Sequence, residues 1–199
     1  MRSRDRVAYA RMALWLLFTL DAQAGAVDPV HSSIAATFAQ MNVPIEQPFR
    51  RFSGTLDFDP TQPAATRAEV NVLTASFDLG NEEYNAELRK PGWFDSARYP
   101  RAIFRSTRVR ALGGERFEVS GVLELKGRTQ TLTLPATIRS AGGIVTADGI
   151  VPISRGYFGI GTADWKDTVA DRVTIHFHLV APVASGAPAS GLPARPKNP

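Results

Sequence analysis

Apolar and polar residues alternate along most of the chain between residues 28 and 182. A period of two is typical of β-strands that turn one face to a core and the other to water. Gly, Pro, Asn and Asp, which favour turns, separate the alternating segments. The pattern predicts eight strands, at residues 31–43, 52–58, 65–77, 101–109, 117–125, 129–139, 144–154 and 172–180.

The clearest hairpin lies at residues 117–139, where Lys126-Gly127 supplies the turn between two alternating strands. Eight antiparallel strands are explained more easily by a closed barrel than by an open sheet, because closure removes unpaired edges. A barrel of this size either fills with its own side chains or holds one small ligand. Small residues at inward positions are expected to leave room inside, and these are Ala36, Gly54, Ala102 and Gly121.

A short helix interrupts the strands between the third and the fourth. Asn81 is a suitable N-cap, and Glu82 and Glu83 follow in the first turn, where the helix dipole favours acids. Pro91-Gly92 ends the helix, and Trp93 and Phe94 come directly after it. We expect this helix and the two aromatic residues to form a lid over one end of the barrel.

The two ends of the chain differ from its middle. Residues 1–26 have the form of a cleaved signal peptide, with an Arg-rich start, the apolar run 12–20 and small residues around Ala24. That run is too short to span a membrane, which takes about 20 residues. Residues 183–199 are rich in Ala, Pro, Ser and Gly and are expected to be a disordered tail. The folded domain is therefore expected at residues 27–182, in an exported, periplasmic protein.

Charge and composition exclude several classes of function. The net charge is +4, and residues 1–24 hold four Arg and two Asp, so the remainder carries only +2 with no run of Lys or Arg. This does not predict a nucleic-acid-binding surface. The absence of cysteine excludes disulfides, a thiolate nucleophile and thiolate metal sites.

Two groups of polar residues have competing interpretations. His176 and His178 lie on one strand face, and His31 lies on a strand that would neighbour it in a barrel, so a zinc or copper site competes with three solvated imidazoles. The charged loop from Arg155 to Asp171 either meets a ligand head group or is simply hydrated. No nucleophile elbow, paired-carboxylate spacing or phosphate loop is present, so no enzyme activity is predicted.

Residues 28–182 resemble the YceI-like family of periplasmic, lipocalin-like proteins. Each matching segment is weak alone, and their order over nearly the whole domain is specific. One departure is Tyr84-Asn85, which replaces an Arg-Asp pair common on the family's lid helix. The matching segments are DPVHS at 28–32, FSGTLDFD at 52–59, SFDLG at 76–80, EL at 87–88, WFD at 93–95, YP at 99–100, FRS at 104–106, GVLELKG at 121–127 and RGYFGIG at 155–161.

The resemblance implies a lipocalin-like barrel that binds an isoprenoid lipid or an isoprenoid quinone, with no covalent cofactor. The alternative function is that of a filled barrel that acts as an interaction module for a membrane redox partner of cytochrome b561 type. Residues 159–165 also resemble the branch of the family that is found with such partners. A homodimer is a further expectation. The residues expected to contact the ligand are Phe38, Phe52, Val72, Leu88, Trp93, Phe94, Phe104, Leu123, Phe158 and Phe177.

Overall fold

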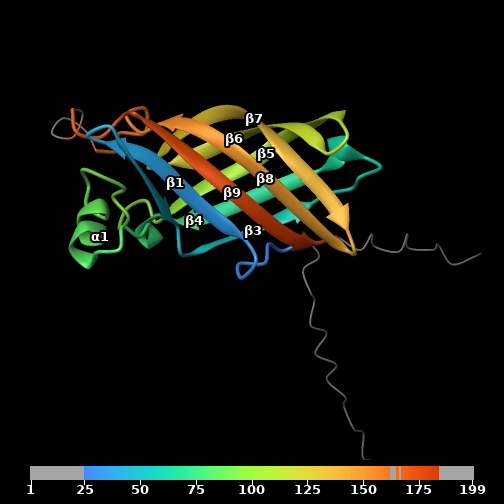
Figure 1. The fold of residues 1–199 in the computed structure, drawn as a ribbon, viewed down its shortest axis with the longest axis horizontal. Coiled ribbons are helices and arrows are strands. Elements are labelled where there is room, and N and C mark those ends of the chain that lie inside the picture. Colours follow the sequence, from blue (N-terminus) through green and yellow to red (C-terminus); the bar gives the residue numbers. More distant parts are fainter. Residues whose placement is uncertain (1–24, 162–164, 166, 184–199) are drawn as a thin grey trace, which may run out of the picture.

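The computed structural model describes residues 25–161, 165 and 167–183. It contains one nine-stranded antiparallel sheet and one α-helix, α1 (Figure 1). The predicted signal peptide, apart from its last two residues, and all but the first residue of the predicted tail lie outside the described residues. The elements are β1 (Ser33–Gln40), β2 (Val43–Pro48), β3 (Phe52–Asp57), β4 (Arg67–Leu73), α1 (Glu82–Leu88), β5 (Arg101–Gly113), β6 (Arg116–Leu125), β7 (Arg128–Ala141), β8 (Ile144–Ser154) and β9 (Arg172–Pro182), with short 3₁₀ turns at Pro63–Ala65 and Thr74–Ser76.

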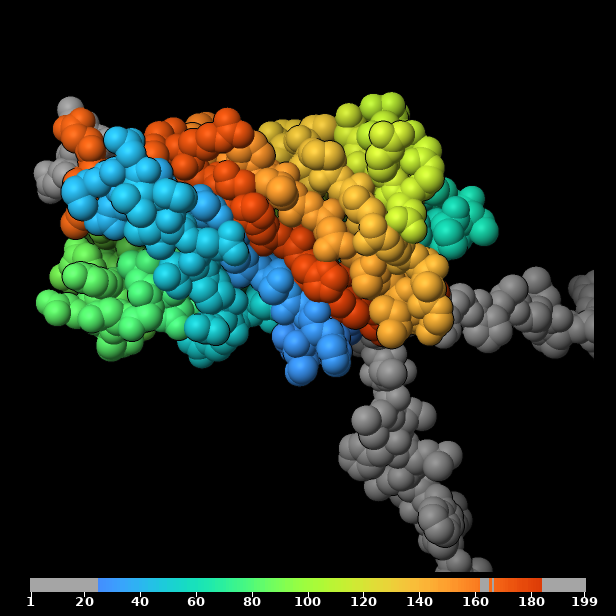
Figure 2. Space-filling model, viewed as in Figure 1, coloured from blue at the N-terminus to red at the C-terminus, as the bar shows by residue number. Residues whose placement is uncertain are grey.

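The sheet curls into a barrel in the order β2-β1-β9-β8-β7-β6-β5-β4-β3. The segment before β1 closes one end of the seam, because Ala26 bridges Thr55 of β3 while the Asp28 amide donates to the Val180 carbonyl of β9 at 2.7 Å. Phe49 closes the other end through a bridge to Phe77. On the face seen in Figure 2, the side chains of β1, β9 and β8 form a continuous wall.

The predicted all-β fold with one short helix is confirmed, but the strand count of eight is wrong. The chain turns back at Met41 and Asn42, which both have positive φ (47° and 64°), and β2 then pairs with β1. Neither residue is Gly, and β2 holds Pro44 and Pro48, so the sequence lacks the usual signals of a hairpin. Proline is tolerated in β2 because it is an edge strand.

The fourth predicted strand is longer than expected and changes phase. A bulge between Ser106 and Arg108 shifts the pairing of β5 with β6. The inward positions move from Ala102 and Phe104 to Val109, which is buried, and the strand runs on to Gly113. Simple alternation would have placed Val109 on the outer face.

The largest cluster of buried side chains fills the end of the barrel that lies opposite α1. Its buried side chains come from all around the barrel and include Leu56, Phe58, Val109, Phe117 and Val145. Phe58 and Phe117 meet edge to face with their ring centroids 5.5 Å apart. None of the helices in the described part of the chain has the length and hydropathy needed to cross a membrane.

Candidate functional site: an apolar cavity under the lid

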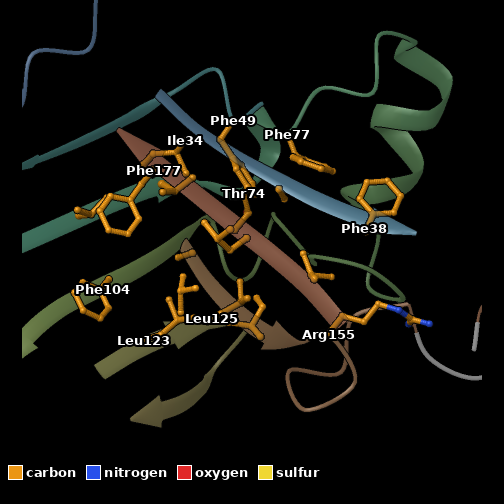
Figure 3. Close-up of a pocket in the computed structure, with 18 of the residues that line it drawn as sticks. Ile34, Phe38, Phe49, Thr74, Phe77, Phe104, Leu123, Leu125, Arg155 and Phe177 are labelled. Carbon is orange, nitrogen blue, oxygen red and sulfur yellow. The ribbon is translucent and has the colours of Figure 1, made fainter. Parts of the chain in front are cut away.

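A cavity of about 730 Å³ occupies the barrel between this packed end and α1. Its size falls within the range of cavities that take one small ligand, about 300–1,000 Å³. In Figure 3, Phe104 and Phe177 lie toward one end of it, while Phe38 and Arg155 lie toward the end with α1. Apolar side chains from the barrel strands make up most of the wall, so the cavity suits an apolar ligand.

Eight of the ten residues predicted from the sequence line this cavity. Leu88 of α1, with Trp93 and Phe94 after it, forms the lid side, as the position of the helix predicts. The other five come from the strands. The eight are Phe38, Val72, Leu88, Trp93, Phe94, Phe104, Leu123 and Phe177.

The other two, Phe52 and Phe158, do not line this cavity. Phe52 faces inward at the start of β3 and packs against the main core cluster, as Phe104 and Phe177 also do. Phe158 is 1% exposed and lies in a separate cluster with Leu125 and Ile153, where its ring stands perpendicular to that of Tyr157. Both side chains fill core rather than cavity wall.

Sequence reasoning missed an aromatic cluster near the lid. Phe49 and Phe77 line the cavity with their ring centroids 4.7 Å apart, and both also pack against Phe94. Phe49 lies between β2 and β3, and Phe77 follows a 3₁₀ turn. Phe49 lay outside every predicted strand. Phe77 ended the predicted strand 65–77, but β4 stops at Leu73 and a 3₁₀ turn follows, so alternation did not show where its ring lies.

The inward glycines do not leave room in the way that the sequence suggested. A Cβ built on Gly121 would lie 2.4 Å from Cζ of Phe104, and one on Gly149 would lie 2.4 Å from Cζ of Phe177. The space beside each glycine is therefore occupied by a phenyl ring from the neighbouring strand. These two rings form part of the cavity wall because the glycines allow them to lie flat.

The polar contacts of α1 fix the lid in place. Asn81 is the N-cap, as predicted, and its Oδ1 accepts from the amides of Glu83 (2.8 Å) and Tyr84 (3.3 Å). Asn85 is buried, and its Oδ1 accepts from the Leu79 amide at 2.7 Å while its Nδ2 donates to Oδ1 of Asp78 at 3.0 Å. The Asn that departs from the family pattern thus ties the helix to the segment before it.

Asp78 connects this helix to the barrel. Besides Asn85, its carboxylate accepts from the Gly80 amide at 2.8 Å and from Nε of Arg50 at 3.0 Å. These donors, Asn85 first among them, stabilise the ionised form and hold the pKa of Asp78 below its usual value. The charged carboxylate is therefore part of what keeps the lid closed.

Arg155 organises the loop on the other side of the cavity mouth. Only 6% of the residue is exposed, and its five N–H groups donate to the carbonyls of Ala170, Ile160, Gly161, Trp165 and Val169. For Arg155 this differs from both sequence interpretations, because its guanidinium is neither hydrated nor free to bind a head group. Arg155 thereby ties Gly161, Trp165 and Val169 together beside the cavity, which Trp165 lines. Asp164 and Lys166 of the same charged loop lie outside the described residues.

Further contacts join the two sides of the mouth. Nζ of Lys126 donates to the carbonyls of Pro91 (2.8 Å) and Gly159 (2.6 Å), and partial burial lowers the pKa of this lysine. The Gly161 amide donates to the Gly92 carbonyl at 2.9 Å. The segment after the lid helix is therefore held against the loop that Arg155 organises.

Two buried polar atoms belong to cavity-lining residues. Oγ1 of Thr66 and Nε1 of Trp93 have no hydrogen-bond partner among the described residues. A buried donor without a partner costs about 1–3 kcal/mol. Both atoms are covered by the protein itself, so neither belongs to the surface that the cavity presents to a ligand.

The three histidines do not converge on a metal site. Nδ1 of His178 lies 2.6 Å from Oδ1 of Asp148, and Nδ1 of His31 lies 2.6 Å from Oδ2 of Asp28. The residues that the structure describes contain no group of three or more His, Asp or Glu side chains arranged to hold a metal ion. His31 and His178 thus each have a carboxylate neighbour.

Comparisons with known proteins agree with this architecture. The chain is 37% identical over 94 residues to Protein YceI of Escherichia coli O157:H7 and 34% identical over 94 residues to a UPF0312 protein of Azotobacter vinelandii. Each match covers 47% of this chain and 49% of the relative, so the aligned part spans about half the length of these curated relatives.

Solved structures match over a longer part of the chain. BcnA of Burkholderia cenocepacia is 43% identical, with a TM-score of 0.75 over 78% of this chain and 99% of that one. A polyisoprenoid binding domain from Saccharophagus degradans, implicated in plant cell wall breakdown, shares the fold at 16% identity, with a TM-score of 0.67 over 81% of this chain and 99% of that one. The family model described as YceI-like domain matches residues 26–181, and the chain therefore belongs to the YceI-like family.

Proposed function

We propose that this protein is an exported, periplasmic carrier that holds one isoprenoid lipid or isoprenoid quinone in its barrel. The observation that carries the proposal is the apolar cavity of about 730 Å³ beneath an aromatic lid. A filled barrel acting only through its surface would need that volume to be packed. The ligand named for the Saccharophagus degradans domain, which shares this fold, supports an isoprenoid as the cargo.

Binding in this cavity needs no covalent step. Each Å² of apolar surface removed from water contributes about 25 cal/mol, so several hundred Å² of buried ligand surface offset the cost of association. Phe104, Phe177 and the rings under the lid supply such surface. We therefore describe the protein as a binding protein rather than an enzyme.

A cavity-blocking variant tests the proposal. Farnesol, or a quinone carrying the same farnesyl tail, is titrated into the protein. Ala102 lines the cavity, so Ala102→Trp should abolish binding, whereas Thr131→Trp on the exposed outer face of β7 should leave it unchanged. Equal binding by both variants would show that the ligand lies elsewhere.

A second variant tests the lid. Trp93→Ala removes a ring that lines the cavity beside the lid helix, so it should weaken binding of farnesol and of the farnesyl quinone by about tenfold. Leu112→Ala, at an exposed position on β5, is the control. Unchanged binding by Trp93→Ala would argue against the lid assignment.

A further inference from the structure

Four large apolar side chains are exposed around the mouth of the cavity. Met41 and Val43 lie at the tip of the β1–β2 hairpin, Tyr84 lies on α1, and Trp165 lies in the loop before β9. They are 70%, 59%, 61% and 36% exposed, respectively. We call these four residues the mouth rim.

The rim residues belong to neighbouring elements. The Met41 amide donates to the Thr168 carbonyl at 2.8 Å, and the Val169 amide donates to the Trp165 carbonyl at 2.9 Å. The ring centroids of Trp165 and Trp93 are 5.4 Å apart, which joins the loop to the lid. In Figure 1, α1 and the turn between β1 and β2 lie at the same end of the barrel.

The rim is continuous with the cavity wall. Tyr84 and Trp165 line the cavity themselves, and Gln40 and Ile45 line it from the same hairpin as Met41 and Val43. At the opposite end the lining residues are buried, as for Ile138 (4% exposed) and Leu179 (5% exposed). The cavity therefore opens within a ring of exposed apolar side chains.

The charges on the lid are largely paired. Arg89 of the lid segment pairs with Glu82 at 2.8 Å, and Lys90 pairs with Glu87 at 2.5 Å. A surface without a strong field of one sign is better suited to a neutral partner than to a polyanion. Tyr and Trp are also the side chains enriched at the boundary between water and lipid.

We propose that the mouth rim docks on the surface of a lipid bilayer, so that an apolar ligand passes directly between the bilayer and the cavity. The transfer step rests on the proposed function, because an isoprenoid dissolves in membranes and not in water. A bilayer fits the rim better than a second copy of the chain does, since two mouths placed face to face would close both cavities to exchange. Docking itself needs no bound ligand.

The test compares two double variants on phosphatidylcholine vesicles. Met41→Gln/Val43→Gln changes rim residues that do not line the cavity. Leu112→Gln/Ile144→Gln is the matched control, because these residues are 42% and 48% exposed and lie near the hairpin turns at the opposite end. Cosedimentation with empty vesicles measures docking, and the rate at which farnesyl quinone moves from vesicles to protein measures transfer.

The rim variant should lose at least about tenfold in both docking and transfer, while the control variant matches the unaltered protein. Equal docking by the two variants would overturn the proposal. The proposal would also be overturned if the unaltered protein formed a dimer and did not bind vesicles, and if the rim variant abolished that dimer. The rim would then be an interface between copies of the chain. A failure of the proposed function would give a different result. Farnesyl quinone would then bind no variant in a titration without vesicles, while cosedimentation would still measure docking.

Discussion

At the scale of single residues, the mouth depends on two charged groups with different kinds of partner. Arg155 is surrounded by carbonyl oxygens, and Asp78 accepts from one amide and two side chains. Neither role follows from the sequence, because the partners of Arg155 lie 5 to 15 residues away in an irregular loop and Arg50 lies 28 residues from Asp78. Only Asn81, whose partners are two and three residues away, was predictable.

Replacing Arg155 should destabilise the fold. Arg155→Met keeps most of the side-chain volume but leaves several buried carbonyls without a donor, so we expect a loss of about 3 kcal/mol in the free energy of unfolding. Arg116→Met is the control, because Arg116 is exposed on β6. Urea unfolding measures both, and equal stabilities would contradict the role assigned to Arg155.

Asp78 should make the stability of the fold depend on pH in the acid range, and comparison with a variant that lacks its carboxylate measures this contribution. Because its pKa is lowered in the folded state, its ionised form stabilises the fold above the unfolded-state pKa of about 3.9, and this contribution is lost as the pH falls through the folded-state pKa. The stability difference between the unaltered protein and Asp78→Asn should thus be constant from pH 7 to about pH 5 and shrink below about pH 4. Thermal unfolding across this range measures it, and a difference that does not vary with pH would argue against the assignment.

At the scale of elements, the sequence predicts the strands in which apolar and polar residues alternate regularly, and it misses the features that interrupt this alternation. The strands β6 and β7 follow the predicted alternation closely, because one face of each is buried and the other is more exposed to water. The edge strand β2 was missed because its two prolines are unusual in a strand. The bulge in β5 was missed because it shifts the alternation by one residue. The sequence placed Gly121 on the correct face, but it could not show that the ring of Phe104 covers this glycine, because that depends on the cross-strand register.

The pairing of glycine with phenylalanine across strands can be tested with a double-mutant cycle. A Cβ on Gly149 would collide with Phe177, so Gly149→Ala should cost about 1–3 kcal/mol. Phe177→Leu removes most of the ring that causes the collision, so the double variant should lose less than the sum of the two single changes. Additive losses in chemical denaturation would show that the ring does not depend on the glycine.

At the scale of the whole molecule, alternation and turn signals were enough to predict a barrel but not its interior. Whether eight or nine strands enclose a cavity or a packed core depends on how far the side chains reach across it, which a pattern of period two does not encode. The lid was predictable because its helix signals are local. The closure of the mouth was not, because Lys126 and Gly161 meet the lid segment across long sequence distances.

The most direct test of the carrier proposal is to identify what the protein holds when it is purified from its own cells. Native mass spectrometry before and after organic extraction would show bound lipid, and Ala102→Trp, which should block the cavity, is purified in parallel. We predict one isoprenoid lipid or quinone per chain, absent from the Ala102→Trp protein. If the unaltered protein is empty and takes up neither added farnesol nor the farnesyl quinone, the carrier proposal is wrong.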